Sequence, residues 1–280
     1  MTEYLILSAD DISKFEPDKT VIVSVLSPME THGKHLPVGT DIFIARRVLE
    51  QTCRILAERF KILRLPDICL GSDAQPVFGS ISLGYGTLKN MVIDIGKSLA
   101  KMGFKYWIIF DNHGGPRHQL ALVDAIKSLR KHRLTLVVPF LHIFQEMLKD
   151  SKQIEIPAAM NGDIRDLHAG TNETSLMLHA YPEMVRSHNF ERYFPTRKSR
   201  LGRFIRFLRS EEIAVIVDWI NDPKNPHYVG DPSKADAQQG KKMIEYHVKR
   251  SVELFEEALN LNYEPPKLYN PLIRLLLRIL

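Results

Sequence analysis

The chain has 280 residues, of which 44% are hydrophobic and 25% charged, and a formal net charge of +5. This composition is ordinary for a soluble globular protein and allows a large core. No apolar run approaches the roughly 20 residues that a membrane span requires, and the acidic N-terminus lacks the basic start of a signal peptide. The two cysteines, Cys53 and Cys69, form no CxxC pair, which argues against a disulfide or zinc-thiolate framework. We therefore expect a cytoplasmic protein.

Apolar runs typical of strands alternate with stretches of helical periodicity along the chain. The strands are expected at 20–26, within 61–71, at 106–110 and at 134–141. The helices are expected at 40–60, 88–103, 116–132, 172–181 and 234–260, with an amphipathic C-terminal tail at 261–280. This alternation predicts a three-layer α/β/α fold with a mostly parallel central sheet, in a single domain that covers residues 1–280.

Polar clusters follow the predicted strands, where the ligand sites of parallel α/β sheets form. They are ETHGKHLPVGTD (30–41), DNHGGP (111–116) and RDLHAGTNETS (165–175). Each combines histidine or acid with glycine, which lets the backbone turn tightly near a ligand. Taken singly, these residues have simple structural explanations, since Asp41 would cap the helix it begins and Glu173 would be favoured by a helix dipole. Together, the three clusters predict a metal site with oxygen and nitrogen ligands.

The motifs in these clusters resemble those of the creatininase (creatinine amidohydrolase) family. The family's E-x-H-G-x-H-L-P-x-G-T-D is matched at 30–41, and its N-G-H-G-G-N is similar to DNHGGP at 111–116. Its H-A-G-x-x-E-T-S is present at 168–175. Two later segments, FGSISLGYGT (78–87) and VGDPSKADAQQG (229–240), also resemble parts of the family. The first motif is long and specific.

The resemblance implies a hydrolase of C–N bonds that uses two divalent metal ions. Its ligands would be Glu30 and His113 on one ion, His32 and Glu173 on the other, and Asp41 as the bridge between them. Imidazole and carboxylate ligands favour zinc, manganese or iron over calcium. Two such ions can share a water molecule, lower its pKa and direct it at a carbonyl carbon. The resemblance also implies a homo-oligomer, commonly a hexamer.

Further residues of the motifs are expected to support the reaction. His168, which is not among the ligands, is placed to move a proton from water to the leaving nitrogen. Gly114 and Gly115 would let main-chain N–H groups approach a developing oxyanion. His35 is expected to orient a ligand.

The expected substrate class follows from departures from the family pattern. Members that act on creatinine carry a glutamate ligand where Gly115 stands here and a tryptophan where Ile164 stands. The loop 72–87 offers Asp73 and Gln75, which suit a small polar ring or a short amide. We therefore expect hydrolysis of a cyclic amide, a formamide or a short peptide-like C–N bond, with creatinine a poor substrate.

Two alternative hypotheses use the same residues. A mononuclear iron site would explain His32, His113 and one acid but would leave two carboxylates unused. A degenerate family member would serve as a metal-binding scaffold or as an oligomeric or membrane-peripheral subunit, through the basic segment 192–209 and the tail 271–280. The segment 192–209 has no nucleic-acid motif, so we expect a solvated or subunit-facing surface and no nucleic-acid partner. Metal analysis separates the three hypotheses: the dinuclear site predicts two ions per chain, the mononuclear iron site one, and the degenerate member none.

Overall fold

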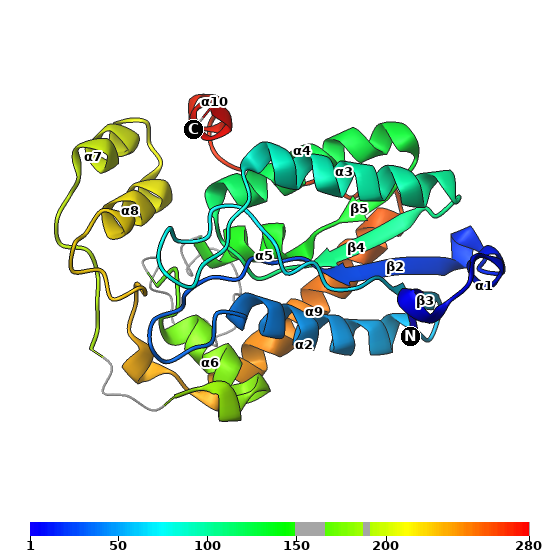
Figure 1. The fold of residues 1–280 in the computed structure, drawn as a ribbon, viewed down its shortest axis with the longest axis horizontal. Helices are drawn as coiled ribbons and strands as arrows, with labels where there is room; N and C mark the ends of the chain where they lie inside the picture. The colour runs from blue at the N-terminus through cyan, green and yellow to red at the C-terminus, as the bar shows by residue number, and fades with distance from the viewer. Residues whose placement is uncertain (149–165, 187–190, 280) are drawn as a thin grey trace.

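A parallel sheet forms the centre of the fold (Figure 1). In residues 1–148, 166–186 and 191–279, which the computed structural model describes, it has five strands in the order β1-β3-β2-β4-β5. Their bounds are Thr2–Glu3 (β1), Thr20–Val25 (β2), Lys61–Arg64 (β3), Tyr106–Phe110 (β4) and Thr135–Val137 (β5). Every residue of β2 is buried, as its nearly continuous apolar run predicts for a central strand covered on both faces.

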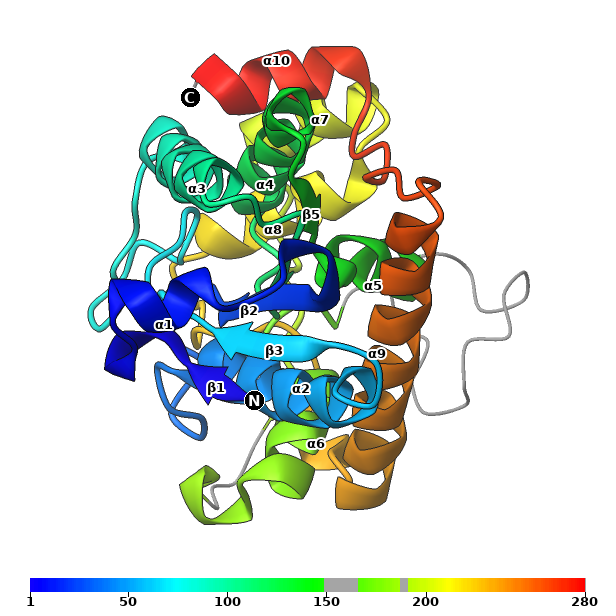
Figure 2. The same cartoon turned by 90° about the vertical axis from the view of Figure 1, so that its right-hand side faces the viewer.

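Helices cover both faces of the sheet, so the predicted three-layer α/β/α fold is confirmed (Figure 2). On one face lie α3 (Tyr85–Lys101) and α4 (Pro116–Leu129), and on the other α2 (Thr40–Leu56) and α9 (Ala237–Leu259). The helix α6 (Thr171–Ala180) packs against both α2 and α9. Most of the buried apolar side chains of the strands and helices form one continuous core.

The register of β2 and β4 places two of the polar clusters side by side. The two strands pair in parallel from Val21 opposite Tyr106 to Val25 opposite Phe110. Both strands therefore end at the same edge of the sheet. The loops that carry residues 30–41 and 111–116 leave the sheet at this edge, where the carboxyl ends of parallel strands form ligand sites.

Several element bounds differ from the prediction. The strand expected at 134–141 was wrong over its second half, because β5 ends at Val137 and a helix, α5 (Pro139–Leu148), begins two residues later. Proline is favoured in a first helical turn, where its missing N–H leaves no hydrogen bond unmade, so Pro139 suits a helix start. The helix expected at 40–60 ends at Leu56, and α3 begins at Tyr85, inside the predicted loop.

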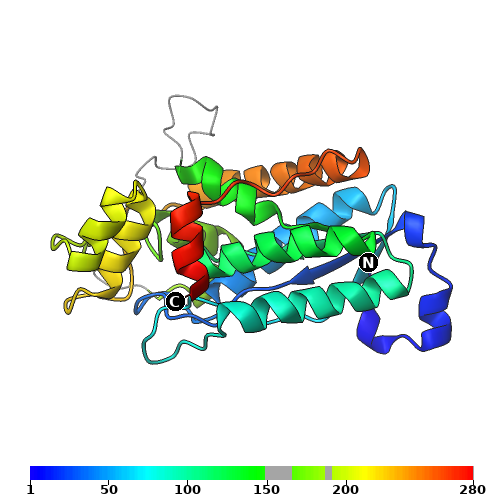
Figure 3. The same cartoon turned by 90° about the horizontal axis from the view of Figure 1, so that it is seen from above.

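Two helices, α7 (Arg200–Phe207) and α8 (Glu211–Ile220), were not predicted. They form a hairpin at the end of the molecule that lies away from the N-terminus (Figure 3). Asp218 ties the hairpin together, since its carboxylate accepts hydrogen bonds from the Ser199 N–H and the Arg206 guanidinium, both at 2.7 Å. Part of the basic segment 192–209 is therefore built into a packed hairpin.

The C-terminal tail ends in α10 (Pro271–Ile279), which packs on α4. Arg278 pairs with Asp124 at 2.7 Å, and Ile273 and Leu277 are buried. The remaining short elements are α1 (Ala9–Ser13) and the 3-10 turns Tyr4–Ile6, Pro17–Lys19, Arg130–His132, Pro182–Met184 and Pro232–Lys234. None of the helices in the described part of the chain combines the length and the apolar character needed to cross a membrane.

Candidate metal centre

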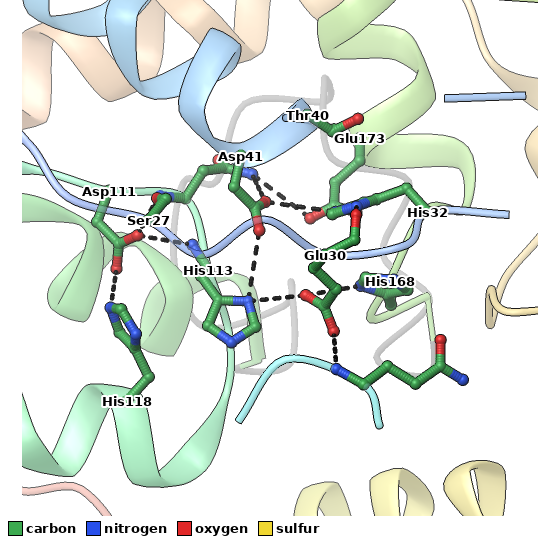
Figure 4. A network of polar contacts seen from close by, with 12 residues as sticks. Ser27, Glu30, His32, Thr40, Asp41, Asp111, His113, His118, His168 and Glu173 are labelled. Carbon is green, nitrogen blue, oxygen red and sulfur yellow. Dashed lines mark hydrogen bonds and ion pairs between the residues drawn. The ribbon is translucent and has the colours of Figure 1, made fainter. Parts of the chain in front are cut away.

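The fold brings the three polar clusters to one buried place (Figure 4). Glu30 and His32 come from the loop after β2, and Asp41 from the first turn of α2. His113 follows β4, and Glu173 lies in the first turn of α6. All but Glu173 are at most 4% exposed. The third cluster lies far from the other two along the chain, so the packing of α6 on α2 completes the site.

Asp41 faces two groups of candidate ligands at once. Its Oδ2 lies 3.4 Å from Nδ1 of His113, which is also 3.0 Å from Oε2 of Glu30. Its Oδ1 lies 3.5 Å from Nε2 of His32, which is also 3.6 Å from Oε2 of Glu173. Within each group the ligand atoms lie within 4.8 Å of one another. Asp41 thus faces into the site, and α2 shows no side-chain N-cap in its place.

Main-chain carbonyls determine which nitrogen of each imidazole faces the carboxylates. The Nδ1–H of His32 donates to the carbonyl of Glu30 at 2.8 Å, and the Nε2–H of His113 donates to the carbonyl of Ser72 at 3.1 Å. In a neutral imidazole only one nitrogen carries a proton. The other nitrogen of each ring therefore offers a lone pair to the cluster, as a metal-binding histidine does.

The charges of the site favour the binding of a cation. Burial by itself would lower the pKa of both His32 and His113, but the neighbouring carboxylates outweigh this effect. Asp41, Glu173 and Glu30 raise the pKa of His32 to about 10. Glu30 and Asp41 raise the pKa of His113 well above its usual value. Burial raises the pKa of Glu173 to about 8, helped by the negative charges of Asp41 and Glu30 and opposed by His32. Without a cation, the cluster holds protons to balance its carboxylates. Divalent ions would replace those protons.

Several buried ligand atoms have no hydrogen-bond partner in the described residues unless protons lie between them. They are Oε2 of Glu30, Nε2 of His32 and Oδ2 of Asp41. Leaving a buried polar atom without a partner costs about 1–3 kcal/mol, and more when the group is charged. Three such atoms converge on one place, and their chemistry suits zinc, manganese or iron. The donor set therefore fits the predicted metal ions.

His168 stands beside the ligands with a neutral ring. Its Nε2–H donates to the carbonyl of Thr31 at 2.9 Å, and its Nδ1 lies 3.9 Å from Oε2 of Glu30. The ring packs against His32, with centroids 4.2 Å apart, and against Trp219. Burial lowers the pKa of His168 to about 4, which outweighs the opposite effect of Glu30. The Nδ1 atom therefore keeps its lone pair at neutral pH.

A second layer of buried residues orients the ligands. Asn112 donates through Nδ2 to Oδ1 of Asp41 at 3.2 Å and to Oε1 of Glu173 at 3.4 Å. Asp111 accepts from the hydroxyl of Ser27 and, at 3.1 Å, from the N–H of His113. Asp111 and Asn112 stand where the family motif has Asn and Gly. At these positions they tie His113, Asp41 and Glu173 into one network.

Sequence reasoning missed the role of His118. Its Nδ1 accepts from the N–H of Ser72 at 3.2 Å, so its Nε2 carries the proton and faces Oδ2 of Asp111 at 3.2 Å. The Ser72 carbonyl is the group that orients His113. His118 thus contacts Asp111, which accepts from the main-chain N–H of His113 (Figure 4), and Ser72, whose carbonyl accepts from the His113 ring. It lies in α4, outside the three motifs, and no sequence signal marks it.

The supporting residues that were predicted occupy the site in different ways. His35 contacts the carbonyl of Ala169 at 3.0 Å and the hydroxyl of Thr174 at 3.1 Å, so it joins the first and third clusters. Gln75 reaches Glu30 through its backbone, whose N–H donates to Oε1 at 2.6 Å. The role of His35 in orienting a ligand stays a prediction.

Asp73 and two glycines shape the space over the ligands. Oδ2 of Asp73 accepts from the N–H of Arg117 at 2.6 Å, at the start of α4. A Cβ at Gly115 would collide with the His113 ring, and one at Gly114 would lie 2.8 Å from the Phe144 ring. A side chain at Gly115 would displace His113, and one at Gly114 would displace the Phe144 ring. Gly115 leaves no room for a carboxylate ligand in the present arrangement.

A cavity opens over the ligands. Its lining includes Glu30, His113, Glu173, His168, Asp73 and Gln75, and three residues of α8, Ile216, Trp219 and Ile220. The helix α8 thus forms part of the wall of the cavity over the ligands. Ile164, the position expected to distinguish creatinine-specific members, lies outside the described residues.

The chain is similar in sequence and in fold to known proteins. The mycofactocin precursor peptide peptidase of Mycobacterium tuberculosis is 29% identical over 231 residues, which cover 80% of this chain and 79% of that protein. The creatinine amidohydrolase of Pseudomonas putida is 28% identical over 179 residues, which cover 59% of this chain and 66% of that protein. A solved structure titled as manganese creatininase has the same fold, with a TM-score of 0.65 and 19% identity over 92% of this chain and 98% of that one. Residues 6–255 match the creatininase family, described as creatinine amidohydrolase, and the chain therefore belongs to that family.

Proposed function

We propose that this chain is a metal-dependent amidohydrolase that cleaves a C–N bond of a small cyclic amide, a formamide or a short peptide-like substrate. The observation that carries the proposal is the pair of ligand groups that share Asp41. One group adds Glu30 and His113, and the other adds His32 and Glu173. Membership of the creatininase family supports the same class of reaction.

Two divalent ions would be held by these five residues, with Asp41 as the bridge. The two carboxylate oxygens of Asp41 face different imidazoles, which supports one ion on each side. Zinc, manganese and iron are the candidates, because all three accept imidazole and carboxylate ligands. The solved manganese creatininase supports manganese among them.

When bound, the ions would supply an activated water molecule and polarise the substrate carbonyl. The chain's own residues would do the rest. His168 would accept a proton at Nδ1 and deliver it to the leaving nitrogen, since its Nε2–H is held by Thr31 and its ring is neutral. Gly114 and Gly115, which present backbone without side chains, would let N–H groups approach the developing oxyanion. The α8 side chains over the cavity would keep bulk water out.

The proposed substrate class follows from what the site can accommodate. Glu173 would supply the second carboxylate, because a side chain at Gly115 collides with His113. This difference from creatinine-hydrolysing members supports a substrate other than creatinine. The similarity to a peptidase that acts on a precursor peptide supports a peptide-like C–N bond.

A panel assay tests the proposal. The purified protein is analysed for metals, stripped with a chelator and reloaded with Zn²⁺, Mn²⁺ or Fe²⁺. Each form is then assayed with a cyclic amide, an N-formyl amino acid, a short peptide and creatinine. We expect two ions per chain and turnover of one of the first three classes that is lost on chelation and restored by metal. Efficient creatinine turnover would refute the substrate argument.

The same measurements separate the two alternative hypotheses. One ion per chain would favour the mononuclear iron site, and two bound ions without turnover would favour a scaffold. The homo-oligomer stays a prediction, which the mass of the protein in solution tests.

A further inference from the structure

A second cavity lies beside the metal centre, between α5, α6 and α9. Its lining shares Gly114, Phe144, Leu167, His168 and Glu173 with the cavity over the ligands, so the two spaces meet at the site. We call it the α5–α9 cavity. Away from the ligands its walls are largely apolar and are formed by Phe140, Phe144, Met147 and Leu176.

His247 brings a polar group to the apolar part of this cavity. It lies on α9, lines the cavity and is only 2% exposed. Its Nε2 is buried and has no hydrogen-bond partner in the described part of the chain. Burial alone lowers its pKa to about 4, so the ring is neutral at neutral pH. A buried imidazole nitrogen without a partner destabilises the folded state unless a ligand satisfies it.

Asn172 provides a second unsatisfied group on the same cavity. Its Oδ1 is buried and, among the described residues, has no hydrogen-bond partner. The residue is 7% exposed and lines the cavity one position before Glu173. Because an amide oxygen can only accept, it requires a donor from whatever occupies the cavity.

Away from the metal ligands, the described lining of the cavity offers no positive charge to an anionic occupant. Asp166 also lines it, and its Oδ2 accepts the N–H of Thr171 at 2.8 Å. A neutral imidazole and an amide oxygen offer no positive charge to balance a carboxylate brought in by a substrate. An uncharged donor group satisfies both Asn172 and His247, since neutral imidazole can donate or accept.

We propose that the α5–α9 cavity is a specificity subsite for an uncharged substrate group that ends in a hydrogen-bond donor, such as a primary amide or a hydroxyl, and that His247 and Asn172 recognise it. The proposal rests on the amidohydrolase function, because the subsite would hold the part of the substrate next to the cleaved C–N bond. Apolar walls with a few placed polar groups are typical of ligand pockets.

The side chains of leucine, asparagine and aspartate provide a matched test, because they have nearly the same shape and differ in polarity and charge. Binding of the three free amino acids to the metal-loaded protein is measured by calorimetry. Hydrolysis of their N-formyl derivatives is measured separately as kcat/KM. We expect asparagine to bind about 10-fold more tightly than leucine, the effect of one to two satisfied hydrogen bonds, and aspartate to bind most weakly.

Variants of His247 assign the preference to this residue. In His247→Leu the preference for asparagine over leucine should fall, because only Asn172 remains to recognise the amide, and in His247→Gln, which keeps a hydrogen-bonding side chain, more of it should remain. His142→Leu is the control, since His142 also has a buried Nε2 without a partner in the described residues but is not among those lining either cavity. Metal content and Tm confirm that each variant is folded.

The two readouts separate the subsite from the reaction. Equal binding of leucine and asparagine, an unchanged preference in His247→Leu, or no binding of any of the three would overturn the subsite. A preference in binding without hydrolysis of any formyl derivative would count against the formamide activity and leave the subsite intact. Hydrolysis of a formyl derivative without any preference in binding would count against the subsite and leave the formamide activity intact.

Discussion

The indole of Trp219 packs against the imidazole of His168, with ring centroids 5.0 Å apart and an angle of 42° between the rings. Trp219 is 4% exposed and belongs to α8, in a part of the chain where no helix was predicted. Its Nε1 is buried and has no hydrogen-bond partner within the described residues, and the residue lines the site cavity. The hairpin thus helps to bury His168.

Trp219→Ala should therefore expose His168. We expect the pKa of His168 to rise from about 4 toward its ordinary value, because burial is the main cause of the lowering. We also expect kcat/KM to fall by about 10-fold or more as water enters the site. Titration of ¹⁵N-labelled histidine by NMR measures the pKa of His168, and steady-state kinetics measures kcat/KM. Trp219→Phe, which keeps an aromatic ring, is the control, and an unchanged pKa in Trp219→Ala would contradict the shielding role.

Asp41→Asn should lose both metal ions. An amide oxygen cannot replace the two anionic oxygens that face His32 and His113. Elemental analysis of the purified variant measures the loss. Asp124→Asn, which removes a surface acid that pairs with Arg278, is the matched control and should keep its metals. Two ions per chain in Asp41→Asn would rule out the bridge.

His168→Asn separates a proton carrier from a ligand. As a proton carrier, His168 can be replaced with metal content near that of the wild type, while kcat falls by roughly 10²–10⁴-fold. The ligand atoms of Glu30, His32 and His168 also lie within 4.8 Å of one another, so His168 is a candidate ligand as well, and the variant distinguishes the two roles. Loss of an ion from the variant would make His168 a ligand.

Asp218→Asn should loosen the hairpin that covers the site. Burial by itself would raise the pKa of Asp218, but the hydrogen bond from Ser199 and the charge of Arg206 lower it overall. Its folded-state pKa thus lies below the unfolded value of about 3.9, so the carboxylate stabilises the protein above that pH and the contribution is lost as pH falls through the folded-state pKa.

We expect Asp218→Asn to cost about 2 kcal/mol at pH 7, the scale of a hydrogen bond to a charged group, and much less at pH 3. Denaturant unfolding at the two pH values measures the cost, and hydrogen exchange shows whether α7 and α8 open first. Glu211→Gln is the control, because Glu211 also pairs with Arg206 but is 64% exposed and should contribute little. Equal losses of unfolding free energy at both pH values would contradict a contribution from the charge of the Asp218 carboxylate.

Residues close together in the sequence made much of the site predictable. Gly33 adopts a φ of 66°, and a Cβ there would lie 2.9 Å from His35, so the spacing of the first motif reflects local backbone geometry. The buried run of β2 and the helical period of α2 were readable for the same reason. A wrong strand at 139–141 shows the limit, since a short apolar run suits a strand and a buried helix equally.

The sequence by itself determined the α/β class and the family, and it marked the polar residues that meet at the carboxyl edge of the sheet. These features depend on local periodicity and on motifs of a few residues. Only the tertiary structure decided that Asp41 faces two histidines instead of capping its helix, and that His118 supports His113. It alone placed Trp219 over His168 and His247 in the neighbouring cavity. Those relationships join residues far apart in the chain, and they depend on how helices pack against the sheet, which no local pattern records.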